Sequence, residues 1–549
     1  MQDLYSIELA RRGYVVLALD LHSHGDSESL SIAELYDGAV GVDGAVQLIA
    51  SLPYVDTARI GVTGHSSGGT AANMAVEIDN SRETPLIAAV LQQAGDWQDD
   101  TGGDHSGDYG SRSVGIIAST HDDFYFGTYD DAGNMLTNPV AFMETDGAKK
   151  FLNFNEDGFA GIAEGGKYYT RDFDGKTAYR VIYRPNMIHP LVAFSTTCVG
   201  YAVDFFDTTL GAPKPLPASD QIWPIKAVFN SLGVIGLLIF MVSFTLVLLD
   251  TPVFSALRSG EIVQPAPVQD SGAKAWYWVL LIIGAVFSGS SFLFCMNTVY
   301  SKTTNFFVQT GPLTIGTWAA LCGIFAIFCS AVFYGAYGKK HGWSARRAGL
   351  YLNLEQLWKT IALAVIVIVV SFGLVFAAHY FFQVDYRMYV VAFKTFGADK
   401  VLIALRYLPF FLLFYVMNSI SANCFNYNTI GGKNGNILIF AFFNALGAIF
   451  VVASQYIYFY ATGYQLYGLT EGQRIGPIWL FPCMVLLFVT PIMSRIIYKR
   501  TRNPYIAGLI NAMFIVMISC SNTTTILGGG ELIATTFLIK PRFYITAAV

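Results

Sequence analysis

The chain has 549 residues, of which 53% are hydrophobic and only 13% are charged, about half the charged share of an average soluble domain. The formal net charge of −5 argues against nucleic acid as a partner, because binding to phosphates needs a basic surface. Of the seven cysteines, only Cys198 precedes residue 225, which excludes a disulfide framework in that part of the chain.

The charged residues are unevenly distributed along the chain. Residues 1–225 have a normal charge density, whereas 227–527 consist of long apolar runs broken by short polar loops. Long apolar runs are typical of membrane spans, and a proline-rich stretch near residue 215 marks a boundary. We therefore predict a globular domain over 1–211, a linker over 212–226 and a polytopic membrane domain over 227–549.

Strand-like and helix-like segments alternate in the globular part. In chain order the patterns predict a helix over 4–12, a buried strand over 14–20, a helix over 32–52, strands over 59–63, 85–93, 114–118 and 177–183, and a closing helix over 192–208. This alternation is typical of an α/β fold, with a parallel sheet covered by helices on both faces.

The sequence Gly64-His65-Ser66-Ser67-Gly68 lies between the predicted strand 59–63 and a run of small residues suited to a helix. G-x-S-x-G in this setting indicates a nucleophile elbow. We expect Ser66 to have a strained backbone that points its hydroxyl outward, and we expect a side chain at Gly64 or Gly68 to collide with the neighbouring backbone.

Two stretches carry a resemblance to a known family. The residues from 13 to 27 (GYVVLALDLHSHGDS) and from 56 to 69 (DTARIGVTGHSSGG) resemble the α/β-hydrolase superfamily, nearest its esterase and dienelactone-hydrolase-like branches. The resemblance covers residues 1 to about 211. It implies an α/β-hydrolase sheet, here followed by an all-α transmembrane bundle, and a serine hydrolase activity.

The resemblance also implies the catalytic residues. Ser66 is the nucleophile, Asp122 after the strand 114–118 is the acid, and His189 after the last strand is the base, in the chain order of the family. The backbone N–H of Ser67 is one oxyanion donor. Asp123, next to Asp122, is an alternative acid.

The chain departs from the family at its start. The family's sheet has three strands before the one that matches 14–20, and the third carries a His-Gly loop with the second oxyanion donor. We therefore expect an N-terminally truncated domain with a gap in the sheet between 14–20 and 59–63, and impaired activity for the chain as given. The aromatic-rich excursion 124–177 is either a lid over the substrate or a surface insertion.

No cofactor or metal is expected, because no cluster of histidine and carboxylate residues has metal-ligand spacing. His65 and His121 flank motif residues and are interpreted as structural. The partners expected are a small-molecule or lipid-like acyl substrate and the lipid bilayer, with no nucleic acid, and the oligomeric state is left open.

Eight apolar segments are each long enough to cross a bilayer as a helix of about 20 residues. They cover approximately 227–249, 275–297, 311–335, 359–382, 402–422, 435–460, 476–494 and 505–526, and a re-entrant piece or ninth span over 523–539 is an alternative. Loops after odd-numbered spans hold more Lys and Arg than the others, including Arg495, which predicts that they face the cytoplasm. The globular domain is then extracytoplasmic in a multi-pass membrane protein; a cytoplasmic globular domain is the alternative if Met1 is the natural start.

These observations predict a membrane-anchored serine hydrolase that cleaves carboxylester or related acyl bonds through an acyl-enzyme. The alternative is a transporter or sensor whose globular part is a degenerate hydrolase used only for binding. The complete Ser/Asp/His set favours the enzyme, and the missing first strands favour the alternative.

Overall fold

A computed structural model describes residues 3–25, 27–31, 33–98, 103–129, 135–268 and 270–527. The chain forms two compact units. Unit 1 contains residues 1–226 together with 455–475 and 525–549, and unit 2 contains 227–454 and 476–524. Part of the stretch assigned to the membrane domain from sequence, 455–475, thus belongs to unit 1.

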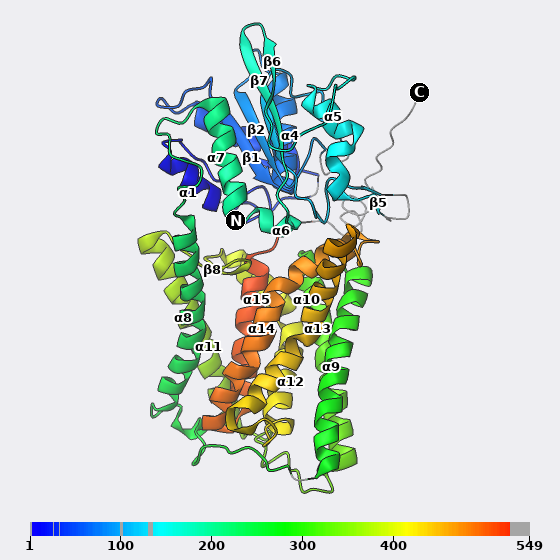
Figure 1. Cartoon of the computed structure of the whole chain (residues 1–549). Coiled ribbons are helices and arrows are strands. Elements are labelled where there is room, and N and C mark those ends of the chain that lie inside the picture. The colour runs from blue at the N-terminus through cyan, green and yellow to red at the C-terminus, as the bar shows by residue number, and fades with distance from the viewer. Residues whose placement is uncertain are drawn as a thin grey trace. The chain divides into compact units, whose positions relative to one another are not determined.

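A small mixed sheet forms the centre of unit 1. Its strands are β1 (Ile60–His65), β2 (Ile87–Gln93), β3 (Ser113–Ile117), β7 (Lys176–Tyr183) and β6 (Tyr169–Phe173), in that spatial order. The first four are parallel neighbours and β6 pairs antiparallel with β7. The predicted strands 59–63, 85–93, 114–118 and 177–183 are therefore confirmed, whereas β6 was not predicted. The hairpin of β6 and β7 extends past the other strands (Figure 1).

Helices pack on the sheet. The helices of unit 1 are α1 (Asp3–Arg11), α2 (Asp37–Val40), α3 (Val42–Ala50), α4 (Ser67–Asn80), α5 (Asp146–Leu152), α6 (His189–Val192) and α7 (Thr196–Leu210). α4 packs on β1 and β2 and is covered by α2 and α3, while α7 packs on β1, β2, β3 and β7 and contacts α1. Gly61 and Gly115 lie directly under Phe206 and Phe205 of α7, so the absence of side chains there lets α7 approach the sheet.

Two predictions for the start of the chain are wrong. Residues 14–20 form no strand, and Val15, Leu17 and Leu19 are 44%, 46% and 40% exposed. Among the described residues, no strand pairs with the free side of β1, so the apolar run lacks the hydrogen-bonding neighbour that a buried strand requires. The single helix predicted over 32–52 is two short helices, broken at Gly41, where φ is +94°.

The excursion 124–177 contributes to the core of unit 1. It contains the short strands β4 (Thr128–Tyr129) and β5 (Met135–Thr137), a 3₁₀ helix (Pro139–Glu144), α5 and β6. Tyr125, Phe126 and Phe151 are at most 3% exposed, and the Trp97 ring stacks 5.7 Å from that of Phe151. Its aromatic side chains therefore pack against the sheet domain instead of decorating its surface.

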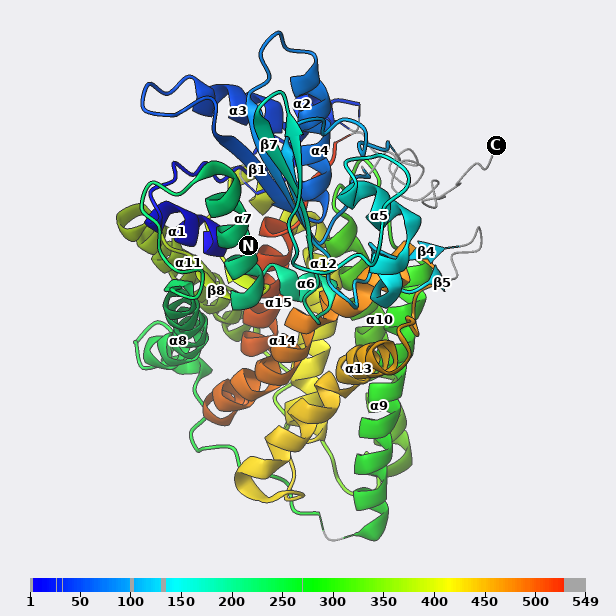
Figure 2. The same ribbon diagram turned by 45° about the horizontal axis from the view of Figure 1, so that its top comes forward.

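Among the residues that the structure describes, eight helices are long and apolar enough to cross a membrane, which fits a multi-pass membrane protein, and they build unit 2. They are α8 (Trp223–Leu249), α9 (Ser271–Thr298), α10 (Thr310–Phe333), α11 (Leu354–Phe382), α12 (Ala398–Ile420), α13 (Gly432–Thr462), α14 (Glu471–Thr501) and α15 (Pro504–Ser521). All eight predicted spans are confirmed as helices; the proposed piece over 523–539 lies mostly outside the described residues. α8 and α11 lie at one side of the bundle and α9 at the other (Figures 1 and 2).

The loops after the odd-numbered spans meet at one end of the bundle. The backbone N–H of Ser259 donates to the carbonyl of Arg500 at 2.8 Å, and that of Ala266 donates to the carbonyl of Tyr427 at 2.9 Å. These contacts join the loop after α8 to the loops after α12 and to the end of α14.

The loops after the even-numbered spans form a second, separate group of contacts. The Gln309 side chain, before α10, donates to the carbonyl of Cys520 at 2.9 Å. The Asn522 side chain, after α15, donates to the carbonyl of Ala392 at 2.8 Å, in the β-hairpin Tyr386–Phe393 between α11 and α12. The two groups of contacts agree with helices that run alternately up and down.

Arg495 is not the loop residue that the sequence predicted. It lies inside α14 and is 2% exposed. Its guanidinium donates to the side-chain oxygens of Asn423 at 2.8 Å and Asn436 at 3.0 Å and to the carbonyl of Ala422, and it stacks over the Tyr427 ring. These neutral acceptors replace water around the buried cation, as a charge within a bilayer span requires.

We predict that Gly447→Val destabilises unit 2. A Cβ atom at Gly447 of α13 would lie 2.5 Å from the carbonyl oxygen of Ala285 and 2.8 Å from the amide nitrogen of Gly289 in α9, so the helices must separate, at a cost of about 1–3 kcal/mol. Thermal unfolding in detergent measures the effect. Gly284→Val is the matched control, because no atom lies within 4 Å of a Cβ there; equal melting temperatures for both variants would contradict the prediction.

Candidate active site

Ser66 occupies a sharp turn between β1 and α4. Its backbone has φ 56° and ψ −124°, a conformation that is strained for a residue with a side chain. Two hydrogen bonds hold the turn: the Ser66 N–H donates to the Gln93 carbonyl at 2.9 Å, and the Gly69 N–H donates to the Ser66 carbonyl at 2.8 Å. The local geometry is that expected of a nucleophile elbow.

The glycines around Ser66 are needed for different reasons than the sequence suggested. A Cβ atom at Gly64 would overlap the backbone carbonyl of Gly68, as expected. The prediction for Gly68 itself is wrong, because a Cβ atom there meets nothing within 4 Å. The second tight position is Gly69, where a Cβ would overlap the buried side chain of Gln92.

The structure brings His189 and Asp122 together. His189 Nδ1 lies 2.9 Å from Asp122 Oδ1 and 3.0 Å from Oδ2. Asp122 follows β3, and His189 follows β7 as the first residue of α6. The two turns are joined by the His121 N–H, which donates to the Met187 carbonyl at 3.2 Å. Adjacent parallel strands end at the same edge of a sheet, so their following turns become neighbours.

The carboxylate of Asp122 is fully buried, and protein donors form hydrogen bonds with it in place of water. The Ser119 hydroxyl donates to Oδ2 at 2.8 Å, and the N–H groups of Phe124 and Tyr125 donate to Oδ1 at 3.0 and 2.9 Å. Burial by itself raises the pKa of Asp122, but the charge and hydrogen bond of His189 and these backbone donors lower it below its usual value. Asp122 is therefore ionised at neutral pH.

Three aromatic rings enclose His189, which is 4% exposed. The Tyr125 ring stacks on it at 5.8 Å, the Phe124 ring meets it edge-on at 5.0 Å, and the His65 ring lies 4.7 Å away. Desolvation and the neighbouring His189 lower the pKa of His65 to about 3, so His65 is neutral. Its Nε2 lies 3.1 Å from the His189 carbonyl oxygen. His65 thus packs against His189, a contact that sequence spacing does not reveal.

Asp123, the alternative acid, has a different environment. It is fully buried, and neither carboxyl oxygen has a hydrogen bond of normal length to the described residues. Burial and the adjacent charge of Asp122 raise the pKa of Asp123, although the backbone of His189 and the hydroxyl of Tyr456 lower it in part. The pKa of Asp123 thus shifts in the opposite direction from that of Asp122, and the carboxylate that contacts His189 is Asp122.

Ser66 follows His65, the residue whose ring packs on His189. Within the described ranges the Ser66 hydroxyl forms no hydrogen bond, with His189 or another group. Ser67 is the first residue of α4, so its N–H lies at the positive end of the helix dipole, where it can stabilise a negative charge. The candidate residues Ser66, Ser67, Asp122 and His189 therefore all lie in turns at the same edge of the sheet.

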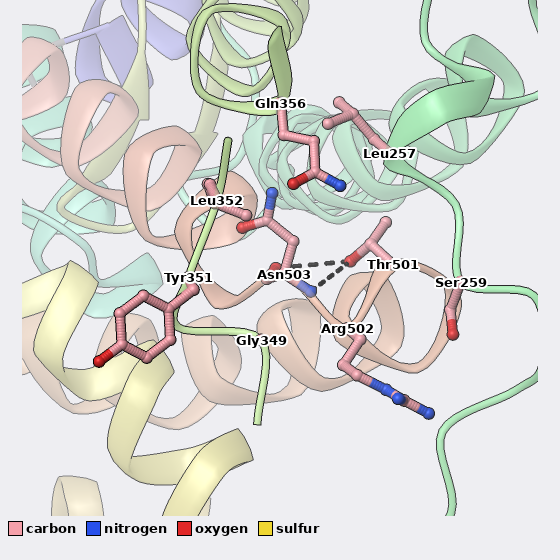
Figure 3. A pocket seen from close by; sticks show the side chains of 9 residues that line it. All are labelled: Leu257, Ser259, Gly349, Tyr351, Leu352, Gln356, Thr501, Arg502 and Asn503. Carbon is pink, nitrogen blue, oxygen red and sulfur yellow. Dashed lines mark hydrogen bonds between the residues drawn. The ribbon is translucent and has the colours of Figure 1, made fainter. Parts of the chain in front are cut away.

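Unit 2 contains a pocket of about 180 Å³. Its lining comes from the segment after α8, from the loop between α10 and α11 with the first turn of α11, and from the junction of α14 and α15: Leu257, Ser259, Gly349, Tyr351, Leu352, Gln356, Thr501, Arg502 and Asn503 (Figure 3). The Asn503 N–H donates to the Thr501 hydroxyl at 3.1 Å, and the Arg502 guanidinium points away from both residues (Figure 3). No group of three or more potential metal ligands occurs among the residues that the structure describes.

No protein-family model, curated protein or solved structure matches this chain. The candidate site is therefore interpreted from its own geometry.

We predict opposite outcomes for the two adjacent aspartates. Asp122→Asn removes the charge that orients His189 and should lower esterase kcat by about 10⁴-fold, as in established Ser-His-Asp triads. Asp123→Asn keeps the shape of the side chain and leaves the contact of His189 with Asp122 intact, so it should retain most of the wild-type rate. Steady-state hydrolysis of a p-nitrophenyl ester at pH 7 measures both. A larger loss of kcat for Asp123→Asn than for Asp122→Asn would indicate that Asp123 is the acid.

Proposed function

We propose that this protein is a membrane-anchored serine hydrolase that cleaves carboxylester or related acyl bonds. The observation that carries the proposal is the buried pair of His189 and Asp122, 2.9 Å apart, beside the strained turn that holds Ser66. A histidine backed by a carboxylate is the general base that a serine hydroxyl needs to become a nucleophile.

Each residue has a defined role in the proposed reaction. Ser66 Oγ attacks the acyl carbonyl while His189 Nε2 accepts the serine proton, and ionised Asp122 stabilises the imidazolium that forms. The Ser67 N–H stabilises the oxyanion. His189 then returns the proton to the leaving alcohol, which departs and leaves an acyl-enzyme. Water activated by His189 hydrolyses that intermediate and regenerates Ser66.

We also propose that unit 1 is a partial α/β-hydrolase domain. The parallel order β1-β2-β3-β7, the elbow between β1 and α4, and the positions of Asp122 and His189 after later strands support this assignment. We propose a small-molecule or lipid-like acyl compound as the substrate, because the proposed chemistry acts on an acyl carbonyl.

One observation favours a different function. Residues 14–20 lie outside the sheet, and β1 is its edge among the described residues, so the described strands leave the second oxyanion donor unassigned. A transporter or sensor that uses unit 1 only to bind a ligand would tolerate this loss, whereas an efficient hydrolase would be slowed by about 10²–10³-fold.

We predict that a fluorophosphonate probe labels the full-length protein and that Ser66→Ala abolishes the labelling. The probe reacts only with a serine that a nearby base activates. In-gel fluorescence of the purified protein measures the reaction, and Ser67→Ala is the control because its backbone N–H remains. A wild-type protein that stays unlabelled over hours would support the binding-only function.

The side of the membrane follows from the distribution of basic residues. The loops that meet at the end of the bundle near Ser259 and Arg500 contain Arg258, Lys339, Lys340 and Arg502. Cytoplasmic loops carry an excess of Lys and Arg. We therefore propose that this end is cytoplasmic and that the sheet domain of unit 1, which precedes the first span, is extracytoplasmic.

We predict that Lys302→Cys reacts with a membrane-impermeant maleimide on intact cells and that Lys340→Cys reacts only after permeabilisation. Both lysines are exposed and lie in loops after the second and third spans, which face opposite sides of the bilayer. The chain without either substitution measures the background labelling of its own cysteines. The reverse labelling pattern would place unit 1 in the cytoplasm.

A further inference from the structure

The segment 455–467 belongs to unit 1, although it comes from the middle of the membrane part of the sequence. It consists of the last two turns of α13 and the loop that leads to α14. The Tyr467 N–H donates to the Gln455 side chain at 2.7 Å, and the Gly463 N–H donates to the Phe459 carbonyl at 2.8 Å. These bonds tie the end of α13 to the loop that follows it.

This segment contacts the residue before Asp122. The His121 ring packs 4.2 Å from the Tyr460 ring and 5.4 Å from the Phe459 ring, measured between centroids. Phe459 is fully buried and His121 is 8% exposed. The other side of His121 is fixed by its N–H bond to the Met187 carbonyl, so the turn after β3 lies between the turn after β7 and the segment 455–467.

The same segment contacts the residue after Asp122. The Gln465 side-chain amide donates to the carbonyl of Asp123 at 2.7 Å, across 342 positions in the chain. Tyr456, 8% exposed, places its hydroxyl near enough to the Asp123 carboxyl to affect its protonation. Both neighbours of the acid are therefore held by a segment that none of the hydrolase motifs includes.

Contacts on both sides of Asp122 restrict its position. The carboxylate orients His189 only if the turn 119–125 keeps its place, and a displacement of about 1 Å in a catalytic site can cost about 10²-fold in rate. We propose that the segment 455–467 holds this turn against His189, so that Gln465 and Tyr460 are positioning residues of the hydrolase. The inference rests on the proposed function and makes the catalytic unit dependent on the loop between two membrane spans.

The test compares variants of the full-length protein in detergent. Gln465→Met keeps the side-chain length but removes the donor, and Tyr460→Ala removes the ring that packs on His121. Both should lower kcat for a p-nitrophenyl ester by about 10- to 100-fold with little change in KM, because neither residue binds the acyl group. Tyr460→Phe retains the ring and should restore the wild-type kcat.

Tyr458→Ala is the matched control. Tyr458 and Tyr460 lie on the same helix end and are 42% and 45% exposed, but none of the ring contacts of the described residues involves Tyr458. Its kcat should equal that of wild type. If Gln465→Met and Tyr460→Ala both matched this control, or if Tyr460→Phe were as slow as Tyr460→Ala, the inference would be overturned.

Hydrogen exchange provides a readout that does not need activity. Peptides covering 119–125 and 186–192 should exchange faster in Gln465→Met and Tyr460→Ala than in Tyr458→Ala, while peptides from β1 and β2 stay unchanged. Unchanged exchange in those turns would refute the positioning role even in an active enzyme. A wild-type protein that hydrolyses no ester and reacts with no fluorophosphonate would instead refute the proposed function.

Discussion

The candidate site depends on one buried interaction, the contact of His189 Nδ1 with the Asp122 carboxylate. A buried carboxylate is stable only when donors replace its lost water, and here the Ser119 hydroxyl and two backbone N–H groups do so. The aromatic rings around His189 exclude water and strengthen the interaction. Because the two residues follow neighbouring strands, the register of β3 and β7 sets their separation.

The contrast between Asp122 and Asp123 shows how environment assigns chemistry to identical side chains. Both are fully buried. Asp122 faces donors and a histidine, whereas Asp123 has no normal hydrogen bond to its carboxyl among the described residues and lies beside a charged neighbour. The pKa of Asp122 is lowered and that of Asp123 is raised, so Asp122, which contacts His189, is the carboxylate placed to stabilise an imidazolium.

The two units meet different physical demands. Unit 1 buries the apolar faces of a sheet against α4 and α7, and glycines at 61 and 115 permit the close contact. Unit 2 must satisfy polar groups without water, which explains the neutral cage around Arg495. The segment 455–475 is subject to the demands on unit 1, although it continues the helix α13, whose first residues belong to unit 2.

The sequence by itself determined the elements whose signal is local. Eight apolar runs specified eight helices, the pattern G-x-S-x-G specified the turn at Ser66, and four apolar runs specified four parallel strands. The family resemblance also identifies the candidate residues Ser66, Asp122 and His189. Their contact could not be derived from spacing, since it depends on which strands become neighbours.

Only the tertiary structure determined the features that depend on contacts between residues distant in the chain. Residues 14–20 have the composition of a buried strand but no strand beside them, so they are exposed. The sequence predicts that Arg495 lies in a loop, whereas in the structure its guanidinium donates hydrogen bonds to Asn423 and Asn436. The choice between Asp122 and Asp123, the support of His65, and the contacts of Gln465 and Tyr460 join residues distant in the chain. Hydropathy and local motifs encode what a segment is, whereas packing alone determines what it touches.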